Sequence, residues 1–151
     1  MNNTYKITTK SDEETIEVAQ NLESEKFPNM VICLNGDLGS GKTVFTKGFA
    51  SAMAIEDVTS PTFNIIKEYI GELPLYHIDV YRTNGKIDNL GIEEYFDKGG
   101  VTIIEWAEMI EDYLPEERLD ITFKITGENS RIMVITPHGE KYVRVCEDAL
   151  W

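Results

Sequence analysis

Basic residues are scarce in this sequence. The 151 residues include 14 lysines and arginines but 27 aspartates and glutamates, and the formal net charge is −13 at pH 7. A protein that binds nucleic acid tightly needs an excess of basic side chains to neutralise phosphates. The charge balance therefore argues against direct, tight nucleic-acid binding and leaves only a local basic patch open.

Cysteines and long hydrophobic stretches are also scarce. The two cysteines, Cys33 and Cys146, lie outside any C-x-x-C or other metal-binding spacing. No apolar run approaches the ~18 residues that a membrane-spanning helix needs, and residues 1–6 lack an apolar signal region. The sequence thus predicts a cytoplasmic protein without membrane contact. We expect one domain over residues 1–151, since 42% of the residues are hydrophobic and can form a core.

A glycine-rich stretch in the first third of the chain fits the pattern G-x-x-x-x-G-K-S/T, whose backbone wraps nucleotide phosphates. Glycine allows positive φ angles and a close approach of the backbone N–H groups to the anion. The lysine places a charge on the β- and γ-phosphates, and the threonine hydroxyl is positioned to ligate Mg²⁺. The predicted cofactor-binding residues are Gly36, Asp37, Leu38, Gly39, Ser40, Gly41, Lys42 and Thr43.

The residues around this stretch predict the elements that such a loop connects. Residues 30–34 are an apolar run typical of a buried strand, and residues 44–53 carry apolar side chains at helical spacing. Residues 63–69 and 75–82 predict two strands that are too close in sequence for a parallel crossover, so we expect an antiparallel pair. The sequence therefore predicts an α/β fold with a mixed sheet flanked by helices.

Further elements are predicted from local signals. A capping-box pattern at residues 11–14 opens a helix after a short strand over residues 4–9. Residues 119–126 and 131–136 predict a hairpin around a Gly-Glu-Asn-Ser turn. Short helices are expected over 90–98 and 107–114, and residues 139–150 fit a helix, although part of that stretch also fits a strand.

Two acids are candidates for the carboxylate that holds Mg²⁺ or orients water near a phosphate loop. Glu105 directly follows the β-branched run over residues 101–104, where a buried parallel strand would end. Asp79 lies within the otherwise apolar strand 75–82. We assign both acids, with Lys42, to catalysis, and we assign Asp79, Glu105 and Thr43 to the metal. The simpler alternatives are a solvated Glu105 and an ion pair of Asp79 with Arg82.

Three other side chains have structural and functional interpretations. Thr62, in a polar turn after the loop's helix, is a candidate cofactor-binding switch residue, or simply a turn residue. His77 fits a packed or hydrogen-bonded strand histidine better than a catalyst. Trp106 is expected to pack at a strand-helix corner beside Glu105, where its fluorescence would report on the site.

Four blocks of this sequence together resemble the TsaE (YjeE) family, the P-loop ATPases of bacterial tRNA threonylcarbamoyladenosine biosynthesis. The resemblance spans roughly residues 5 to 140, and the ordered combination is more specific than the phosphate loop alone. Its blocks are residues 36–43, 59–63, 77–82 and 105–108.

The resemblance implies a P-loop fold, binding of ATP and Mg²⁺, and weak ATPase activity of the isolated chain. It also implies assembly with TsaB and TsaD, where TsaD transfers the threonylcarbamoyl group to the adenosine beside the tRNA anticodon. The chain would then reach tRNA only through this complex. By matching blocks, Lys42 and Thr43 would bind phosphate and Mg²⁺, Thr62 would be switch-like, Asp79 catalytic or Mg²⁺-linked, and Glu105 the strand-end acid.

Three other functions fit a phosphate loop. A small-molecule kinase commonly clamps the transferred phosphoryl group with several arginines, but none of the four arginines here lies in an arginine-rich stretch, and only Arg82 is near one of the four blocks. A regulatory GTPase would need an N-K-x-D motif, which the second half of the chain lacks. A nucleotide-sensing module that rarely hydrolyses its ligand remains open.

Overall fold

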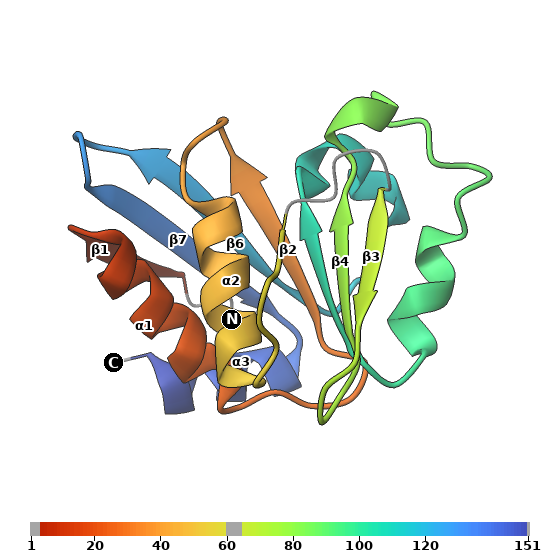
Figure 1. The fold of residues 1–151 in the computed structure, drawn as a ribbon, viewed down its shortest axis with the longest axis horizontal. Coiled ribbons are helices and arrows are strands. Elements are labelled where there is room, and N and C mark those ends of the chain that lie inside the picture. The colour runs from red at the N-terminus through yellow and green to blue at the C-terminus, as the bar shows by residue number, and fades with distance from the viewer. Residues whose placement is uncertain (1–3, 60–64, 151) are drawn as a thin grey trace.

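A seven-stranded mixed sheet runs through the molecule (Figure 1). The computed structural model describes residues 4–59 and 65–150. The strands are β1 (Tyr5–Thr9), β2 (Val31–Gly36), β3 (Ile66–Tyr69), β4 (Leu75–Asp79), β5 (Val101–Glu105), β6 (Arg118–Ile125) and β7 (Arg131–His138).

The strand order is β1-β7-β6-β2-β5-β4-β3. Strand β2 runs parallel to both of its neighbours, β5 and β6, and β4 runs parallel to β5. The β1/β7, β6/β7 and β3/β4 pairs are antiparallel. This arrangement confirms the predicted mixed sheet, the hairpin formed by β6 and β7, and the antiparallel β3/β4 pair.

Within the described part of the chain, three α-helices accompany the sheet: α1 (Asp12–Glu23), α2 (Lys42–Ala52) and α3 (Glu140–Ala149). Figure 1 shows α1 and α2 together over one face. A Cβ at Gly48 of α2 would lie 2.9 Å from the Cα of Ile16 in α1, so this glycine permits the close approach of the two helices. The final stretch is helical, which decides between the two alternatives that the sequence left open.

The two other predicted helices are present, but as 3₁₀ helices and not as α-helices. Residues 92–97 and 107–113 form the 3₁₀ helices η2 (Ile92–Asp97) and η3 (Ala107–Tyr113), and η3 is interrupted at Ile110, where φ is −130° and ψ is 33°. Segments this short do not repay the cost of nucleating an α-helix, so i→i+3 turns form instead. The predicted strand 75–82 also ends early, at Asp79, and η1 (Tyr81–Thr83) follows it.

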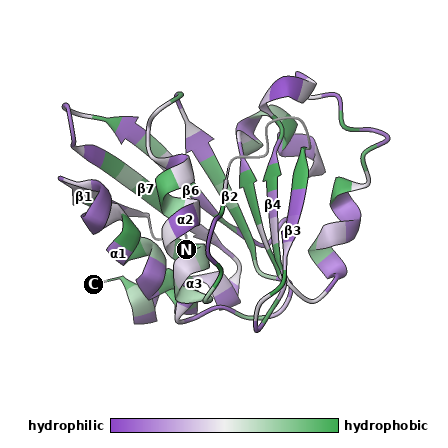
Figure 2. Ribbon diagram, viewed as in Figure 1, coloured by the Kyte–Doolittle hydropathy of each residue, from purple (hydrophilic) through white to green (hydrophobic). Residues whose placement is uncertain are grey.

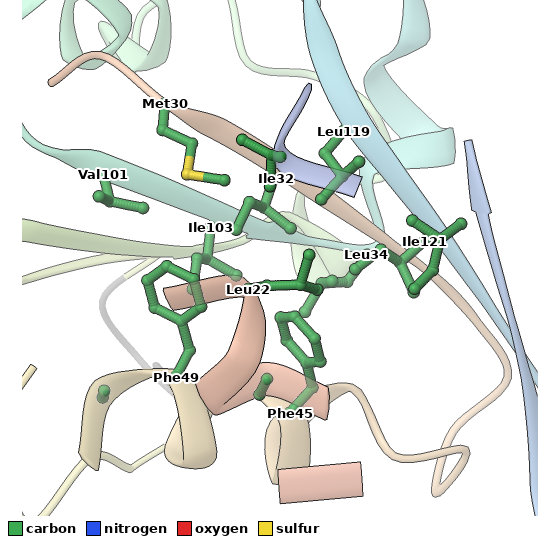
Figure 3. Packing of buried hydrophobic residues seen from close by; sticks show 14 of the residues in the cluster. Leu22, Met30, Ile32, Leu34, Phe45, Phe49, Val101, Ile103, Leu119 and Ile121 are labelled. Carbon is green, nitrogen blue, oxygen red and sulfur yellow. The ribbon is translucent and has the colours of Figure 1, made fainter. Parts of the chain in front are cut away.

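The core has a layer on each face of the sheet. Strand β2 shows the division, because Ile32 and Leu34 belong to the layer under α1 and α2, whereas Val31 and Cys33 face η2 and η3. Burial of one such aliphatic side chain contributes about 1.5 to 3 kcal/mol. Figure 3 shows Leu22, Phe45 and Phe49 pointing from the helices towards the side chains of the central strands.

The outer part of the sheet is half exposed. Buried and partly exposed residues alternate along β6 and β7, and Figure 2 shows the corresponding hydrophobic and hydrophilic bands. The central strand β5 is instead buried along its whole length. Because β2, β4 and β5 are parallel, their carboxyl ends share one edge of the sheet, and the glycine-rich stretch follows β2 at that edge.

Tyr142 joins α3 to the sheet. Its hydroxyl accepts a hydrogen bond from the backbone N–H of Val31 at 2.8 Å, and its ring meets Phe27 edge-on with 5.2 Å between centroids. Burial raises the pKa of Tyr142 to about 12, although the Val31 hydrogen bond opposes the shift. The phenol is therefore held in its neutral form.

Replacement of Tyr142 by Phe is expected to lower the free energy of unfolding by about 1 to 3 kcal/mol, because the buried Val31 N–H loses its acceptor. Urea unfolding of Tyr142→Phe and of the control Tyr113→Phe, whose hydroxyl bonds Asp88 at the surface, measures the difference. The control should change little. The raised pKa also predicts that the gap between wild type and Tyr142→Phe narrows as the pH rises from about 10, the pKa in the unfolded chain, through the folded-state value of about 12. Equal losses in the two variants at neutral pH would contradict this account.

Candidate phosphate-binding site

The glycine-rich loop between β2 and α2 has the backbone conformation that its glycines allow. The φ angles of Gly36, Gly39 and Gly41 are +137°, +76° and +117°. Gly36 also meets its neighbours closely, since a Cβ there would lie 2.6 Å from the carbonyl oxygen of Phe123. The loop therefore requires glycine for conformation and, at position 36, for space.

Lys42 points back over this loop. Its ammonium group donates hydrogen bonds to the carbonyl oxygens of Gly36 and Asp37, and it lies 3.9 Å from the ring centroid of Trp106. Burial lowers the pKa of Lys42, and the negative charges of Glu105 and Glu108 oppose that shift. The loop thus concentrates a positive charge at the predicted phosphate position.

A chain of hydrogen bonds joins the start of α2 to the interior of the sheet. The Thr43 hydroxyl donates to Oε1 of Glu105 at 3.2 Å, and Nε2 of His77 lies 2.5 Å from Oε2 of the same carboxylate. His77 is fully buried and Glu105 is only 3% exposed. A carboxylate accepts hydrogen bonds, so we assign the proton of His77 to Nε2. Both oxygens of Glu105 are therefore oriented, and the interpretation of His77 as a hydrogen-bonded strand histidine is confirmed.

Asp79 lies beside Glu105, because these two residues are directly paired across β4 and β5. Its Oδ1 accepts a hydrogen bond from the backbone N–H of Tyr81 at 3.0 Å, a local turn that ends the strand. Burial raises the pKa of Asp79, and the charge of Glu105 adds to this while the Tyr81 hydrogen bond opposes it. Two acids thus share the end of the sheet that faces the loop.

Trp106 has an unusual backbone, with φ at 63° where β5 ends. Positive φ is rare for a bulky residue, and such conformations gather at functional sites. The ring lies 4.6 Å from that of Tyr81 and under the ammonium group of Lys42. The predicted packing of Trp106 at the strand end is confirmed.

Glu108 holds the start of the glycine-rich loop, a role that was not predicted from the sequence. Its Oε2 accepts a hydrogen bond from the N–H of Gly36 at 3.3 Å, and its own N–H donates to Oδ1 of Asn35 at 2.9 Å. These reciprocal bonds fix the start of the loop to the segment after β5. The signal was present, because Glu108 closes the last of the four sequence blocks.

Arg131 also reaches the loop, although it lies far from every block in the sequence. Its guanidinium packs against Gly41 so closely that a Cβ at position 41 would overlap with it. Its Nη2 donates to Oδ1 of Asp12 at 2.7 Å. Local spacing in the sequence does not indicate this position, because Arg131 reaches the loop through the pairing of β7 with β6 and of β6 with β2.

A cavity of about 550 Å³ opens between the loop and the ends of β4 and β5. The predicted loop residues Leu38, Gly39 and Gly41 line it. The four side chains predicted to bind phosphate or Mg²⁺ or to act in catalysis also line it. Thr62 lies outside the described residues. The cavity wall also includes the charged or hydroxyl-bearing side chains of Asp12, Lys42, Thr43, Asp79, Arg82, Glu105 and Arg131.

The described residues contain no cluster of three or more His, Cys, Asp or Glu side chains that could hold a metal alone. The donors present are the Thr43 hydroxyl and the two carboxylates, which are hard oxygen ligands. Mg²⁺ is usually bound by one or two protein oxygens together with water and phosphate, so this small set fits it. In residues 4–59 and 65–150, no helix is long and apolar enough to cross a membrane.

A buried strand, a glycine-rich loop and a helix, with acids on neighbouring parallel strands, together define the P-loop fold class. Relatives narrow this class further. A family model described as "Threonylcarbamoyl adenosine biosynthesis protein TsaE" matches residues 9–133. The chain belongs to the TsaE family, a family of tRNA threonylcarbamoyladenosine biosynthesis.

Individual relatives agree with this assignment. The tRNA threonylcarbamoyladenosine biosynthesis protein TsaE of Bacillus subtilis (strain 168) is 48% identical over 142 residues, which cover 93% of this chain and 90% of that protein. The protein of the same name from Treponema pallidum (strain Nichols) is 39% identical over 108 residues, covering 70% and 80%. The crystal structure of Bacillus subtilis YdiB matches with a TM-score of 0.87 and 44% identity over 99% of this chain and 95% of that one.

The buried pair of His77 and Glu105 can be tested by a double-mutant cycle. His77→Leu alone should lower the free energy of unfolding by about 2 to 4 kcal/mol, because it leaves a buried carboxylate without its donor. In the Glu105→Gln background, the loss in free energy of unfolding caused by His77→Leu should be smaller by at least about 1 kcal/mol, since a neutral amide depends less on that donor. Urea unfolding of the four proteins gives the coupling energy. Strictly additive effects would show that the 2.5 Å contact does not support the carboxylate.

Proposed function

We propose that this chain binds ATP with Mg²⁺ in the cavity and hydrolyses it slowly, in support of tRNA N6-threonylcarbamoyladenosine modification beside the anticodon. The observation that carries the proposal is the convergence of Lys42, Thr43 and Glu105 on one loop whose backbone leaves room for phosphate. Family membership supplies the biological context. TsaB and TsaD are the proposed partners.

Each side chain has a distinct role in this proposal. Lys42 binds the β- and γ-phosphates as a point charge, and the loop N–H groups bind the remaining oxygens. Thr43 and the acids Asp79 and Glu105 hold Mg²⁺ or its water ligands. A bound Mg²⁺ would neutralise charge on the phosphate oxygens. His77 keeps Glu105 in one orientation, so that its Oε1 stays at the start of α2.

Glu105 is the better candidate for orienting the attacking water. It is nearly buried, is hydrogen-bonded through both oxygens, and lies at the end of a strand adjacent to β2. Asp79 is one strand further from the loop, and its carboxylate accepts a hydrogen bond from the backbone N–H of Tyr81. Asp79 therefore suits the outer part of the Mg²⁺ site, where a ligand through water is sufficient.

The cavity also gives some support to the small-molecule kinase as a second candidate. Arg82 and Arg131 both line it, and such kinases use arginines to clamp a transferred phosphoryl group. Arg131, however, packs against Gly41 and pairs with Asp12, on the opposite side of β2 from the two acids. This position does not suit a γ-phosphate clamp, so the ATPase remains the better-supported function.

Substitutions in the loop and at the acids should have different effects. Lys42→Ala should remove most nucleotide affinity, whereas Glu105→Gln and Asp79→Asn should lower ATP turnover by about 10²-fold while largely preserving ground-state phosphate contacts. ATP binding followed by Trp106 fluorescence and phosphate release measured with the partners separate the two effects. The control is Arg144→Ala, which removes an exposed arginine that pairs with Glu140. Wild-type turnover in both acid variants would show that the roles are wrongly assigned.

Partner dependence is a separate prediction. A positive group on the γ-phosphate is worth ~10³ to 10⁵ in rate, and the isolated chain should therefore hydrolyse ATP well below ~1 s⁻¹ if a partner must complete the site. The net charge of −13 also makes direct coupling to tRNA unfavourable. ATPase rates are compared for the chain alone, with TsaB and TsaD, and with tRNA alone. Stimulation by tRNA without the proteins, or no response to them while modified nucleoside is being made, would refute the proposal.

A further inference from the structure

Three cations line the cavity in the described part of the chain, and each has a different position. Lys42 is bonded to carbonyl oxygens of the loop, and Arg131 packs against the end of the loop on the other side of β2. Arg82 belongs to η1, which follows β4, so it shares the side of β2 that carries Asp79 and Glu105. Arg82 is therefore the cavity arginine on the side where the proposed Mg²⁺ and terminal phosphate lie.

The turn that carries Arg82 is fixed to the end of β4, where Figure 1 shows η1. The Thr83 hydroxyl donates to the carbonyl oxygen of Val80 at 2.6 Å and accepts a hydrogen bond from the N–H of Gly85 at 3.1 Å. The N–H of Thr83 also donates to the carbonyl oxygen of Val80. These bonds hold the backbone on both sides of Arg82, whose own side chain is exposed and extends along the cavity wall.

Stacked side chains connect this turn to the phosphate loop. The ring of Tyr81 lies 4.6 Å from that of Trp106, and the Trp106 ring lies 3.9 Å from the ammonium group of Lys42. Neighbouring strands are about 4.8 Å apart, so the end of β4 is about 10 Å from the end of β2, with β5 between them. Arg82 directly follows Tyr81, and its long side chain can span a gap of this size.

We propose that Arg82 is a catalytic residue that binds the γ-phosphate of ATP and stabilises the charge that develops there during hydrolysis. This inference rests on the proposed function and names the positive group that accelerates its reaction. The partners would then act by positioning an arginine that this chain already carries, and would not need to insert one of their own.

The bond changes of hydrolysis explain why a cation is needed on this side of the cavity. A water oxygen forms a bond to the γ-phosphorus while the bond from that phosphorus to the β–γ bridging oxygen breaks. The electron pair of the broken bond leaves with ADP, one proton of the water stays on the orthophosphate, and the other is released to solvent. Negative charge rises on the bridging oxygen and is spread over the γ-oxygens. A guanidinium has N–H donors in one plane and can contact two of these oxygens at once.

A purely local role is the competing explanation, in which Arg82 serves only the turn or the nearby carboxylate of Asp79. Such a role acts through the shape of the site, so it changes ground-state binding and the transition state alike. A contact that strengthens during the reaction lowers turnover when it is removed but leaves ATP affinity nearly unchanged. ADP with aluminium fluoride imitates the transferring phosphoryl group, so its affinity reports on that contact.

The test uses the full chain with Mg²⁺, alone and with TsaB and TsaD. Arg82→Ala and Arg82→Lys are compared with Lys86→Ala, a matched control. Lys86 is an exposed cation on the segment that follows η1, and it does not line the cavity. Calorimetry measures the affinities for ATP and for ADP with aluminium fluoride, and phosphate release measures turnover. Thermal melts confirm that each variant is folded.

We expect Arg82→Ala to lower ATP turnover with the partners by about 10³-fold and to weaken the binding of ADP with aluminium fluoride by at least about 10²-fold. Its ATP affinity should stay within about threefold of wild type. Arg82→Lys should restore part of the turnover, because it keeps the charge but lacks the planar fork. Lys86→Ala should match wild type in all three measurements.

Wild-type turnover in Arg82→Ala would assign the cation to a partner and overturn the inference. Equal losses of affinity for ATP and for ADP with aluminium fluoride would identify a local role and also overturn it. A wild-type chain that neither binds ATP nor hydrolyses it with the partners would instead overturn the proposed function, and the inference with it.

Discussion

The carboxylate of Glu105 is the group on which the arrangement of the site depends. It is buried at the end of β5, and burial of a charge is costly unless hydrogen bonds compensate. His77 supplies one donor from inside the sheet, and Thr43 supplies another from the first turn of α2. The parallel pairing of β5 with β2 and β4 brings these three residues together. The start of α2 and the interior of the sheet therefore both contact the same carboxylate.

The loop itself is stabilised by contacts from two directions. At its start, the Gly36 N–H donates to Glu108 and the Glu108 N–H donates to Asn35, and near its end Arg131 packs against Gly41. Trp106, in a left-handed conformation, places its ring beside the Lys42 ammonium. The glycines of the loop are thus held by hydrogen bonds and packing from neighbouring segments, which preorganises the loop without filling it with side chains.

The parts of the fold that follow from local patterns were predictable from the sequence. The glycine spacing predicted the loop, and the apolar run over residues 30–34 predicted β2. The short connection before Leu75 predicted that β3 and β4 pair antiparallel. Glu105 was predictable because a buried strand ends at it. Glu108 lies in one of the four sequence blocks, but its contact with Gly36 was not predictable, and neither was the position of Arg131, since both depend on which strands become neighbours. The sequence predicted helices at η2 and η3 but not that they are 3₁₀ helices, because periodicity alone does not distinguish a short 3₁₀ helix from an α-helix.

The position of Arg131 has a consequence for how the chain matures. The phosphate loop is translated in the first third of the protein, whereas the strand that supports Gly41 belongs to the last part. Chains fold during synthesis from the N-terminus onward, and long-range strand pairing is slow. A nascent chain that exposes only β1 to β5 lacks this support, and β1 still lacks its partner β7. The loop therefore gains its contact with Arg131 only after β7 has been synthesised and has paired with the sheet.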